Sequence, residues 1–314
     1  MDKTFNFDFI GRRKLWYALS TILILPGILA LIVWHLNVGI DFRGGTVQDI
    51  AYLANRPSID AVRTTLDKQG IKGSSVQTSG EHDVLVRFPN QAGTTPRAVG
   101  DKVLSALGGA SAVKEVQFSN IGESVAKSTL QQSAWAVALT SLAIIFFVAF
   151  SFRSVPKPAS SWRFGLTAIA ALAHDILFVI GAFALLGHFF PSIEVDSLFI
   201  TAILTILGFS VNDTIIVFDR IRENLRRSPG KTFDEVANSS LNQTLARSIN
   251  TSTTVLLVLL ALLLLGGGSI RNFILALTLG VAIGTYSSIF NASPLLVSWQ
   301  GAAARKLSAP TRTN

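Results

Sequence analysis

The sequence predicts a polytopic α-helical membrane protein with six transmembrane helices and a small α+β domain outside the membrane. Three observations lead to this fold class. Of the 314 residues, 49% are hydrophobic and only 15% are charged, whereas a soluble domain carries about 25% charged residues. Six apolar stretches each approach the roughly 20 residues that a helix needs to cross a bilayer. One long polar segment, residues 37–133, separates the first stretch from the others.

The predicted spans cover residues 15–36, 134–152, 164–187, 197–218, 248–267 and 272–297. Basic residues precede the first span, as in a signal peptide. However, its apolar run is longer than a signal peptide requires and ends in Trp34, His35 and Leu36 instead of small residues, so we expect a retained anchor. The last span, within the membrane region 134–298, is rich in Gly, Ala and Ser, which favours packing against other helices.

Lys and Arg are concentrated in loops that would meet on one side of the membrane. The N-terminal arm 1–14, the 153–163 loop, the loop after the fourth span and the tail 299–314 are basic, whereas the 188–196 loop has no Lys or Arg. The positive-inside rule then predicts that both termini are cytoplasmic. The segment 37–133 then lies on the outer side, because long loops translocate largely regardless of charge.

The outer segment has the pattern of a small folded domain. We expect strands at 46–53, 73–78, 82–88 and 112–119, and helices at 58–70 and 95–107. This βαββαβ order is the ferredoxin-like pattern. On the inner side, Thr232 and Glu235 have capping-box spacing. They predict an amphipathic helix over about 232–247 that lies on the membrane surface and leads into the fifth span.

The composition and the motifs also exclude several function classes. The net charge of +8 follows from the loop bias, so we expect no nucleic-acid partner, while membrane lipids contact the spans. The absence of cysteine removes thiol chemistry and cysteine-based metal sites. The stretch SPGKT (228–232) has Leu225 where a phosphate-binding loop has its first glycine. We therefore predict no enzyme activity and no metal or cofactor.

Asp213 is an ionisable residue within the fourth apolar span, where a charged side chain is not expected. It precedes Asp219 by six residues, so it lies about 9 Å deeper in the membrane, where a charge costs about 2.5–3.5 kcal/mol. Arg247, near the inner end of the next antiparallel span, is the predicted opposite charge. A buried carboxylate beside a movable cation can take up and release a proton. The alternative is a static ion pair that holds two helices together.

Other polar residues are predicted to support this pair. Asn212 can hydrogen-bond nearby, and Arg247 shares a helical face with Gln243, Asn250, Thr251 and Thr254, a stripe that should face protein or water. His174 and Asp175 form a second pair in the third span. They are either a proton relay, because His titrates near neutral pH, or a helix–helix hydrogen bond.

Four motifs resemble the SecD/SecF family of bacterial protein-export proteins, within the RND superfamily. They are VGIDFRGGT (38–46) after the first span, AHD (173–175) in the third, LGFSVNDTIIVFDRIREN (207–224) at the end of the fourth, and ARSINTS (246–252) at the start of the fifth. Physically, Gly39, Gly44 and Gly45 allow unusual backbone angles. The motif, with Asp41, is therefore interpreted as a hinge to the outer domain, or as a plain tight connection.

The resemblance implies a function and partners that the residue patterns alone do not supply. It implies an accessory subunit of the bacterial inner membrane, with the segment 37–133 in the periplasm. Such a subunit pairs with SecD, associates with the SecYEG channel and YajC, and uses the proton-motive force to help exported preproteins across the membrane. It makes Asp213 and Arg247 the proton-transport residues. Two other readings remain open: half of an RND-type exporter of small molecules or lipids, and a purely structural assembly factor.

Overall fold

The computed structural model describes residues 7–80, 82–91, 93–153, 160–228 and 230–307, without the side chains of 301–307. The first part of the predicted N-terminal arm and the last part of the predicted tail lie outside the described residues. Within them, six helices are long and apolar enough to cross a membrane, as predicted. They are α1 (Arg13–Val33), α5 (Glu123–Ser151), α6 (Ser161–Phe189), α7 (Ser197–Arg227), α8 (Phe233–Leu265) and a composite last span over Gly268–Gln300.

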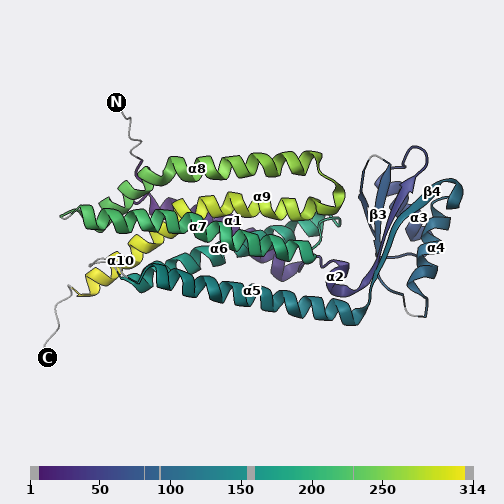
Figure 1. The fold of residues 1–314 in the computed structure, drawn as a ribbon, viewed down its shortest axis with the longest axis horizontal. Helices are drawn as coiled ribbons and strands as arrows, with labels where there is room; N and C mark the ends of the chain where they lie inside the picture. Colours follow the sequence, from purple (N-terminus) through teal and green to yellow (C-terminus); the bar gives the residue numbers. More distant parts are fainter. Residues whose placement is uncertain (1–6, 81, 92, 154–159, 229, 308–314) are drawn as a thin grey trace.

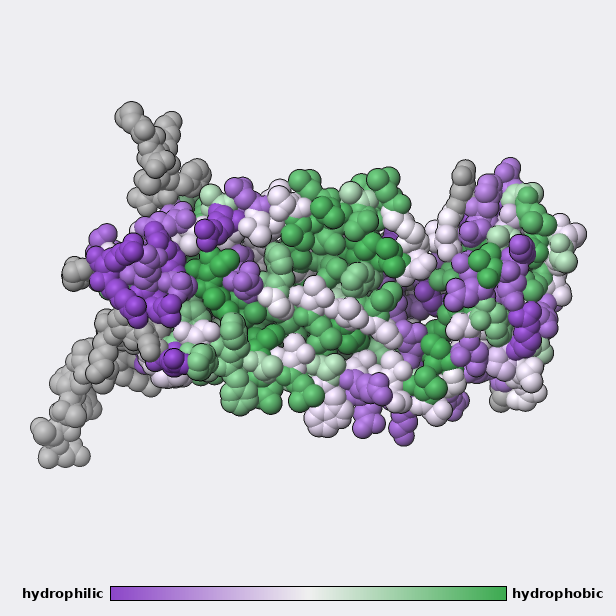
Figure 2. Space-filling model, viewed as in Figure 1, coloured by the Kyte–Doolittle hydropathy of each residue, from purple (hydrophilic) through white to green (hydrophobic). Residues whose placement is uncertain are grey.

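These helices lie side by side as one elongated bundle, with the small sheet domain at one end (Figure 1). The start of α1 and the end of α10 both lie at the opposite end, as an even number of spans requires. Figure 2 shows an apolar surface over the middle of the bundle, between a strongly hydrophilic end and the more hydrophilic sheet domain at the other end. Such a band is what a chain exposes to lipid, so this is a multi-pass membrane protein.

Several helices are longer than their apolar stretches, among them α5 and α8. The helix of the second span begins at Glu123, not at 134, because its polar first turns continue the same helix outside the apolar region. The sheet domain accordingly ends near Gly122. The helix predicted over 232–247 and the fifth span form one uninterrupted helix, α8, which begins at the expected capping box of Thr232 and Glu235. Hydropathy marks only the membrane-embedded part of a helix, so it misses such extensions.

The last span is not a simple α-helix. It consists of the short 3₁₀ turn η2 (Gly268–Ile270), α9 (Arg271–Ser287), the π-helical segment η3 (Ser288–Ala292) and α10 (Ser293–Leu307). A π segment carries one extra residue per turn, so it rotates the side chains that follow it, and such bulges are frequent at functional sites. Nothing in the local sequence, SSIFNAS, predicts this change of helix type.

The sheet domain has the predicted βαββαβ element order. Its strands are β1 (Gly45–Tyr52), β2 (Ser75–Thr78), β3 (Asp83–Phe88) and β4 (Val113–Ile121), with helices α3 (Ile59–Lys68) and α4 (Pro96–Ala106) between them and the short α2 (Ile40–Arg43) and η1 (Gly109–Ser111) at their ends. The strands pair antiparallel in the order β2-β3-β1-β4. Ser58 and Thr95 cap the two helices by accepting hydrogen bonds from Ala61 and Ala98.

The N-terminal segment does not project freely from α1. The amide of Asn242 accepts from the backbone N–H of Phe7, and that of Asn238 accepts from the N–H of Phe9, both over 2.8 Å. Phe9 and Ile10 are buried, so residues 7–10 are packed against the first turns of α8. The inner part of α8 is thereby connected to α1 and belongs to the folded body.

Helices α1 and α6 meet backbone to backbone. A Cβ built on Gly27 would lie 2.8 Å from the Cα of Gly181, and one on Gly181 would lie 2.7 Å from the Cα of Gly27. No side chain fits between them, and such small-residue contacts are a main source of helix association in membranes. This crossing joins the first span to the rest of the bundle.

The sheet domain is attached to the bundle through the loop between α6 and α7. The amide of Gln77 on β2 donates to the carbonyl of Ser192 over 2.6 Å, and Asn272 donates to the same carbonyl over 3.0 Å. A Cβ on Gly268 would lie 1.8 Å from the carbonyl oxygen of Thr78, so the turn before α9 touches edge strand β2 directly. The domain is therefore held against the bundle by backbone contacts.

Glu194 is a buried carboxylate in this junction, 8% exposed. Burial raises the pKa of Glu194, and the nearby Arg87 only partly offsets this. A raised folded-state pKa means that stability is full below the unfolded-state pKa and is lost as pH rises through the folded-state value. We expect Glu194→Gln to raise the melting temperature at pH 8 and to flatten its dependence on pH between 4 and 8. Equal pH dependence of wild type and variant would contradict this assignment.

Candidate functional site

Asp213 lies inside the bundle on α7 and is 5% exposed. Two hydroxyls hold it: Ser248 of α8 donates to Oδ1 over 2.9 Å, and Ser288 of η3 donates to Oδ2 over 2.8 Å. Each is worth more than an ordinary hydrogen bond because its acceptor can be charged. A hydroxyl can also accept a hydrogen bond, so the same pair of serines accommodates a protonated carboxyl. The site suits a group that changes its protonation state.

Ser248 belongs to a row of small hydroxyl residues on α8. The residues Ser240, Thr244, Ser248 and Ser252 recur every four positions and are all buried. That spacing puts them on one face of a helix, and their size lets α8 approach α7 and α9 closely. Further up the same face, Thr285 of α9 donates to Ser252 over 2.6 Å. The hydroxyl face of α8 is therefore the face that packs against Asp213.

Asp175 is a second fully buried carboxylate, on α6, and its environment is built in the same way. Ser210 of α7 donates to Oδ2 over 2.5 Å, and Ser287 at the end of α9 donates to Oδ2 over 2.7 Å. His174 Nδ1 lies 2.9 Å from Oδ1. The structure thus brings the predicted pair His174 and Asp175 together and adds two serines that sequence reasoning missed.

The two carboxylates are linked through consecutive residues of the last span. Ser287 ends α9 and holds Asp175, while Ser288 begins η3 and holds Asp213. Neighbouring residues of a helix point about 100° apart, so these two serines reach carboxylates on two different helices. Any movement of η3 therefore acts on both carboxylates at once.

Arg247 does not lie opposite Asp213, contrary to the sequence prediction. It is exposed, and among the described residues the partners of Asp213 are Ser248 and Ser288. The reason is helical geometry: Arg247 precedes Ser248, so it points about 100° away from the buried face of α8. The contact is made by the next residue of the same helix, Ser248, so the prediction was right about the helix and wrong about the face of that helix.

Three of the predicted supporting residues, unlike His174 and Asp175, lie on the exposed side with Arg247. Asn212 is exposed and makes no described contact with Asp213, and Asn250 and Thr251 are exposed beside Arg247 on α8. A polar row on a membrane-spanning helix should face protein or water rather than lipid. We call Asn212, Arg247, Asn250 and Thr251 the exposed polar face. It leaves the chain with polar groups in its membrane region that its own helices do not cover.

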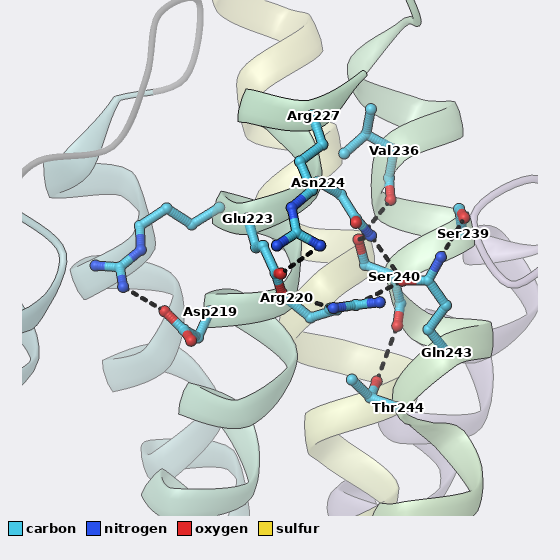
Figure 3. A network of polar contacts seen from close by, with 11 residues as sticks. Asp219, Arg220, Glu223, Asn224, Arg227, Val236, Ser239, Ser240, Gln243 and Thr244 are labelled. Carbon is cyan, nitrogen blue, oxygen red and sulfur yellow. Dashed lines mark hydrogen bonds and ion pairs between the residues drawn. The ribbon is translucent and has the colours of Figure 1, made fainter.

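The end of α7 and the start of α8 are joined by a network of charged and amide side chains (Figure 3). Arg220 donates to Gln243 over 2.6 Å and to Glu223 over 2.6 Å, and Asn224 donates to both Ser240 and Gln243 over 2.9 Å. Ion pairs of this kind near the surface contribute little stability individually. Their effect is to hold the α7–α8 hairpin at one register, and so to keep Ser248 level with Asp213.

The GIDFRGG motif makes a defined connection at the outer ends of the spans. Gly39 donates its N–H to Val195 over 2.8 Å, and Asp41 accepts from the N–H of Ser197, the first residue of α7, over 2.9 Å. Gly44 has φ +78° and Gly45 has φ +151°, where side chains are disfavoured. The motif thus ties the start of the sheet domain to the helix that carries Asp213. Whether it bends as a hinge stays a prediction.

The sequence carried two signals for the serines around the carboxylates. The four-residue repeat Ser240, Thr244, Ser248 and Ser252 marks a small polar face, and the adjacent pair Ser287-Ser288 interrupts an apolar span. Neither pattern predicted the partners of Asp213, because a buried carboxylate was expected to pair with a positive charge. No group of three or more His, Cys, Asp or Glu residues in the described part of the chain could hold a metal ion.

The sequence model described as "Protein export membrane protein SecD/SecF, C-terminal" matches residues 102–302. A protein translocase subunit SecF from Thermobaculum terrenum is 43% identical over 305 residues, which cover 93% of this chain and 94% of the relative. The chain belongs to the SecD/SecF family. Membership gives it a role in protein translocation.

Members of the SecD/SecF family also occur as longer chains. A protein translocase subunit SecDF from Bacillus subtilis is 33% identical, and the match covers 97% of this chain but 40% of that relative. The crystal structure of the translocon-associated membrane protein SecDF from Thermus thermophilus aligns with a TM-score of 0.81 at 31% identity, again over 96% of this chain and 40% of the other. This chain therefore corresponds to less than half of such a SecDF protein.

Proposed function

We propose that this chain is a proton-motive-force-coupled, non-enzymatic subunit of the Sec export machinery, and that Asp213 is its proton-carrying group. The observation that carries the proposal is the setting of Asp213, a buried carboxylate held by two hydroxyls with no described cation beside it. An intramembrane ionisable residue is functional by default. A carboxylate bound only by hydroxyls can be stable with or without its proton, which a static ion pair with arginine could not be.

Arg247 acts, in this proposal, from the exposed polar face together with a SecD partner. The SecDF relatives hold more than twice the length of this chain, so a second half is available to cover that face. When a SecD subunit packs there, Arg247 is removed from lipid and can swing toward or away from the carboxylates. Because arginine stays charged, it controls when Asp213 holds a proton and does not carry one.

The sheet domain is, in the same proposal, a ferredoxin-like periplasmic domain that contacts the exported preprotein. Its antiparallel strand order β2-β3-β1-β4 supports the fold, and the basic inner loops support an orientation with cytoplasmic termini in the inner membrane. The tie between Asp41 and the start of α7 offers a route by which movement around Asp213 reaches this domain through the 39–45 hinge. SecYEG and YajC are the proposed neighbours in the membrane.

Two other functions follow from different outcomes. A half of an RND-type exporter for small molecules or lipids would carry its substrate through the sheet-domain side, and a purely structural assembly factor would need no proton site. The names of the relatives favour protein translocation over the exporter. The hydroxyl setting of Asp213 favours a proton site over a structural role.

Replacing Arg247 by Lys tests the proposed control of the site. Lysine keeps the charge but loses the planar guanidinium. We expect the complex with SecD to assemble normally and the part of export that depends on the proton gradient to fall at least fivefold. The measurement is protein translocation into inverted membrane vesicles, with and without a proton gradient. The isolated chain should keep its melting temperature, because Arg247 is exposed there.

The matched control is Arg271→Lys, the same change at an exposed arginine at the other end of the bundle, at the start of α9. It should leave export unchanged. If the Arg247→Lys variant exports protein as fast as the wild type does, in vesicles where the wild type responds to the gradient, Arg247 has no part in the mechanism. Loss of assembly with SecD would instead favour a structural role for the exposed polar face.

A further inference from the structure

A cavity of about 300 Å³ opens beside α1, away from the exposed polar face, and the mechanism above does not use it. It is lined by α1, by α6 through His174, and by η3 through Asn291. Its α1 wall has three polar residues, Tyr17, Ser20 and Thr21, followed by three apolar ones, Ile24, Leu25 and Ile28. The polar part of the cavity has room and hydrogen-bond partners for water.

Polar contacts continue across the seam between α1 and the last span. The hydroxyls of Tyr17 and Ser298 lie 2.9 Å apart, and those of Ser20 and Tyr286 lie 3.1 Å apart. Tyr286 also donates to the backbone carbonyl of Trp16 over 3.1 Å. Hydroxyls in the membrane region that point between helices, and not at lipid, line places where water can be held.

His174 connects this cavity to the buried carboxylates. The residue is 8% exposed, and its Nδ1 faces Asp175. The other ring nitrogen, Nε2, is buried and has no hydrogen-bond partner among the described residues. The two nitrogens lie on opposite sides of the ring, so Nε2 turns away from Asp175, and His174 lines the cavity. A buried, unsatisfied nitrogen is costly, and a small movement of the ring or of α1 would let water from the cavity bond to it.

We propose that the cavity beside α1 is a water-filled access route for protons, and that His174 passes them between this water and Asp175. The inference rests on the proposed function and adds an entry to it. Water in the cavity gives a proton to Nε2, and the imidazolium then releases its Nδ1 proton to Oδ1 of Asp175. The ring ends neutral with its proton on Nε2, Asp175 ends protonated, and the reverse steps return the proton to water.

The groups around His174 suit this role. Asp175, the next residue of α6, accepts the proton. The ring of Tyr286 on α9 is stacked beside the imidazole, with 6.4 Å between the ring centroids. Tyr17 of α1 lines the cavity. None of the described lining residues is Lys or Arg, so no fixed positive charge opposes the imidazolium. Beyond Asp175, Ser287 and the adjacent Ser288 lead to Asp213, so loading Asp175 changes the setting of the proposed proton site.

Thiol labelling tests whether the cavity holds water. The chain has no cysteine, so a single Ser20→Cys reports on the cavity and Ile22→Cys reports on the lipid-facing side of α1, where Ile22 is 66% exposed. Both are studied in the SecD-containing complex in membranes, with a charged methanethiosulfonate that reacts only with wet thiolates. We expect Ser20→Cys to react at least tenfold faster than Ile22→Cys. Equally slow labelling of both would mean a cavity filled by lipid and would overturn the proposal.

Proton flux tests the role of His174. In proteoliposomes of the complex, with a pH-sensitive dye inside, His174→Gln should slow gradient-driven proton movement at least tenfold and flatten its pH profile between 5.5 and 8. The control is His188→Gln, a histidine of the same helix stacked on Trp34, which should behave as wild type. A second variant, Ser20→Leu, fills the cavity while leaving His174 in place, and should slow the flux as well.

The outcomes separate this inference from the proposed function. If the His174→Gln and Ser20→Leu variants both move protons at the wild-type rate, the access route is wrong and Asp213 remains the proposed proton site. No gradient-driven flux in wild type would overturn both. If His174→Gln does not fold, Ser20→Leu alone decides, since its substitution lies on α1 outside the carboxylate cluster.

Discussion

Asp213→Asn should abolish the gradient-dependent part of protein export while leaving the complex with SecD assembled. Asparagine has nearly the same shape, and its Oδ1 can accept from one of Ser248 and Ser288 while its Nδ2 donates to the other, so both hydroxyls that hold Asp213 keep a partner. The helices therefore keep their contacts, and the chain should melt within a few degrees of wild type. What asparagine cannot do is bind and release a proton. We expect export in a proton gradient to fall to the rate seen without one.

The control for this change lies on the same helix. Asp219→Asn alters a half-exposed carboxylate that pairs with Arg222 over 2.5 Å at the inner end of α7. Because exposed ion pairs contribute at most about 1 kcal/mol, export should be unaffected. If a proton gradient stimulates export in the Asp213→Asn variant as much as in the wild type, Asp213 does not carry the proton. Failure of Asp213→Asn to fold or to assemble would favour the structural reading.

Gly181→Ala should destabilise the membrane domain by about 1–3 kcal/mol, the usual cost of overpacking. The added methyl would lie 2.7 Å from the Cα of Gly27 on α1. Backbone cannot rotate aside as a side chain can, so α1 and α6 must separate along their crossing. The melting temperature in detergent, followed by circular dichroism or light scattering, should fall by several degrees.

Gly165→Ala is the matched control, because it makes the same change in the same helix where nothing lies within 4 Å of the added carbon. There alanine should be neutral or slightly stabilising, since it has the higher helix propensity. Equal melting temperatures for the two variants would contradict the view that the Gly27–Gly181 contact holds α1 in place.

Most of the architecture could be predicted from the sequence because its signals are local. Apolar length located all six spans, and Ser58, Thr95 and Thr232 marked helix starts that the structure contains. Alternation located the four strands of the sheet domain. The errors came where helices continue past their apolar part, at Glu123 and after Thr232, since nothing in hydropathy ends a helix at the membrane surface.

The site was predicted only in part because its chemistry depends on which helix faces meet. Asp213, His174 and Asp175 stood out as ionisable residues in apolar spans, and the structure buries all three. The partners of the carboxylates could not be derived in this way, because serines are common and the π segment that begins at Ser288 has no sequence signature. Arg247 was misplaced for the same reason: one residue along a helix changes the face.

The central claim, that Asp213 takes up and releases a proton within the folded bundle, is tested most directly by infrared difference spectroscopy of the SecD-containing complex across a pH titration. A protonated carboxyl in an apolar setting has a C=O stretching band separate from those of carboxylates and amides. The account predicts a band that appears as pH falls, is absent in Asp213→Asn and persists in Asp219→Asn. Because the buried Asp175 can give a band of its own, the test is the difference between the two proteins: identical titrating bands in wild type and Asp213→Asn at every pH would contradict the claim.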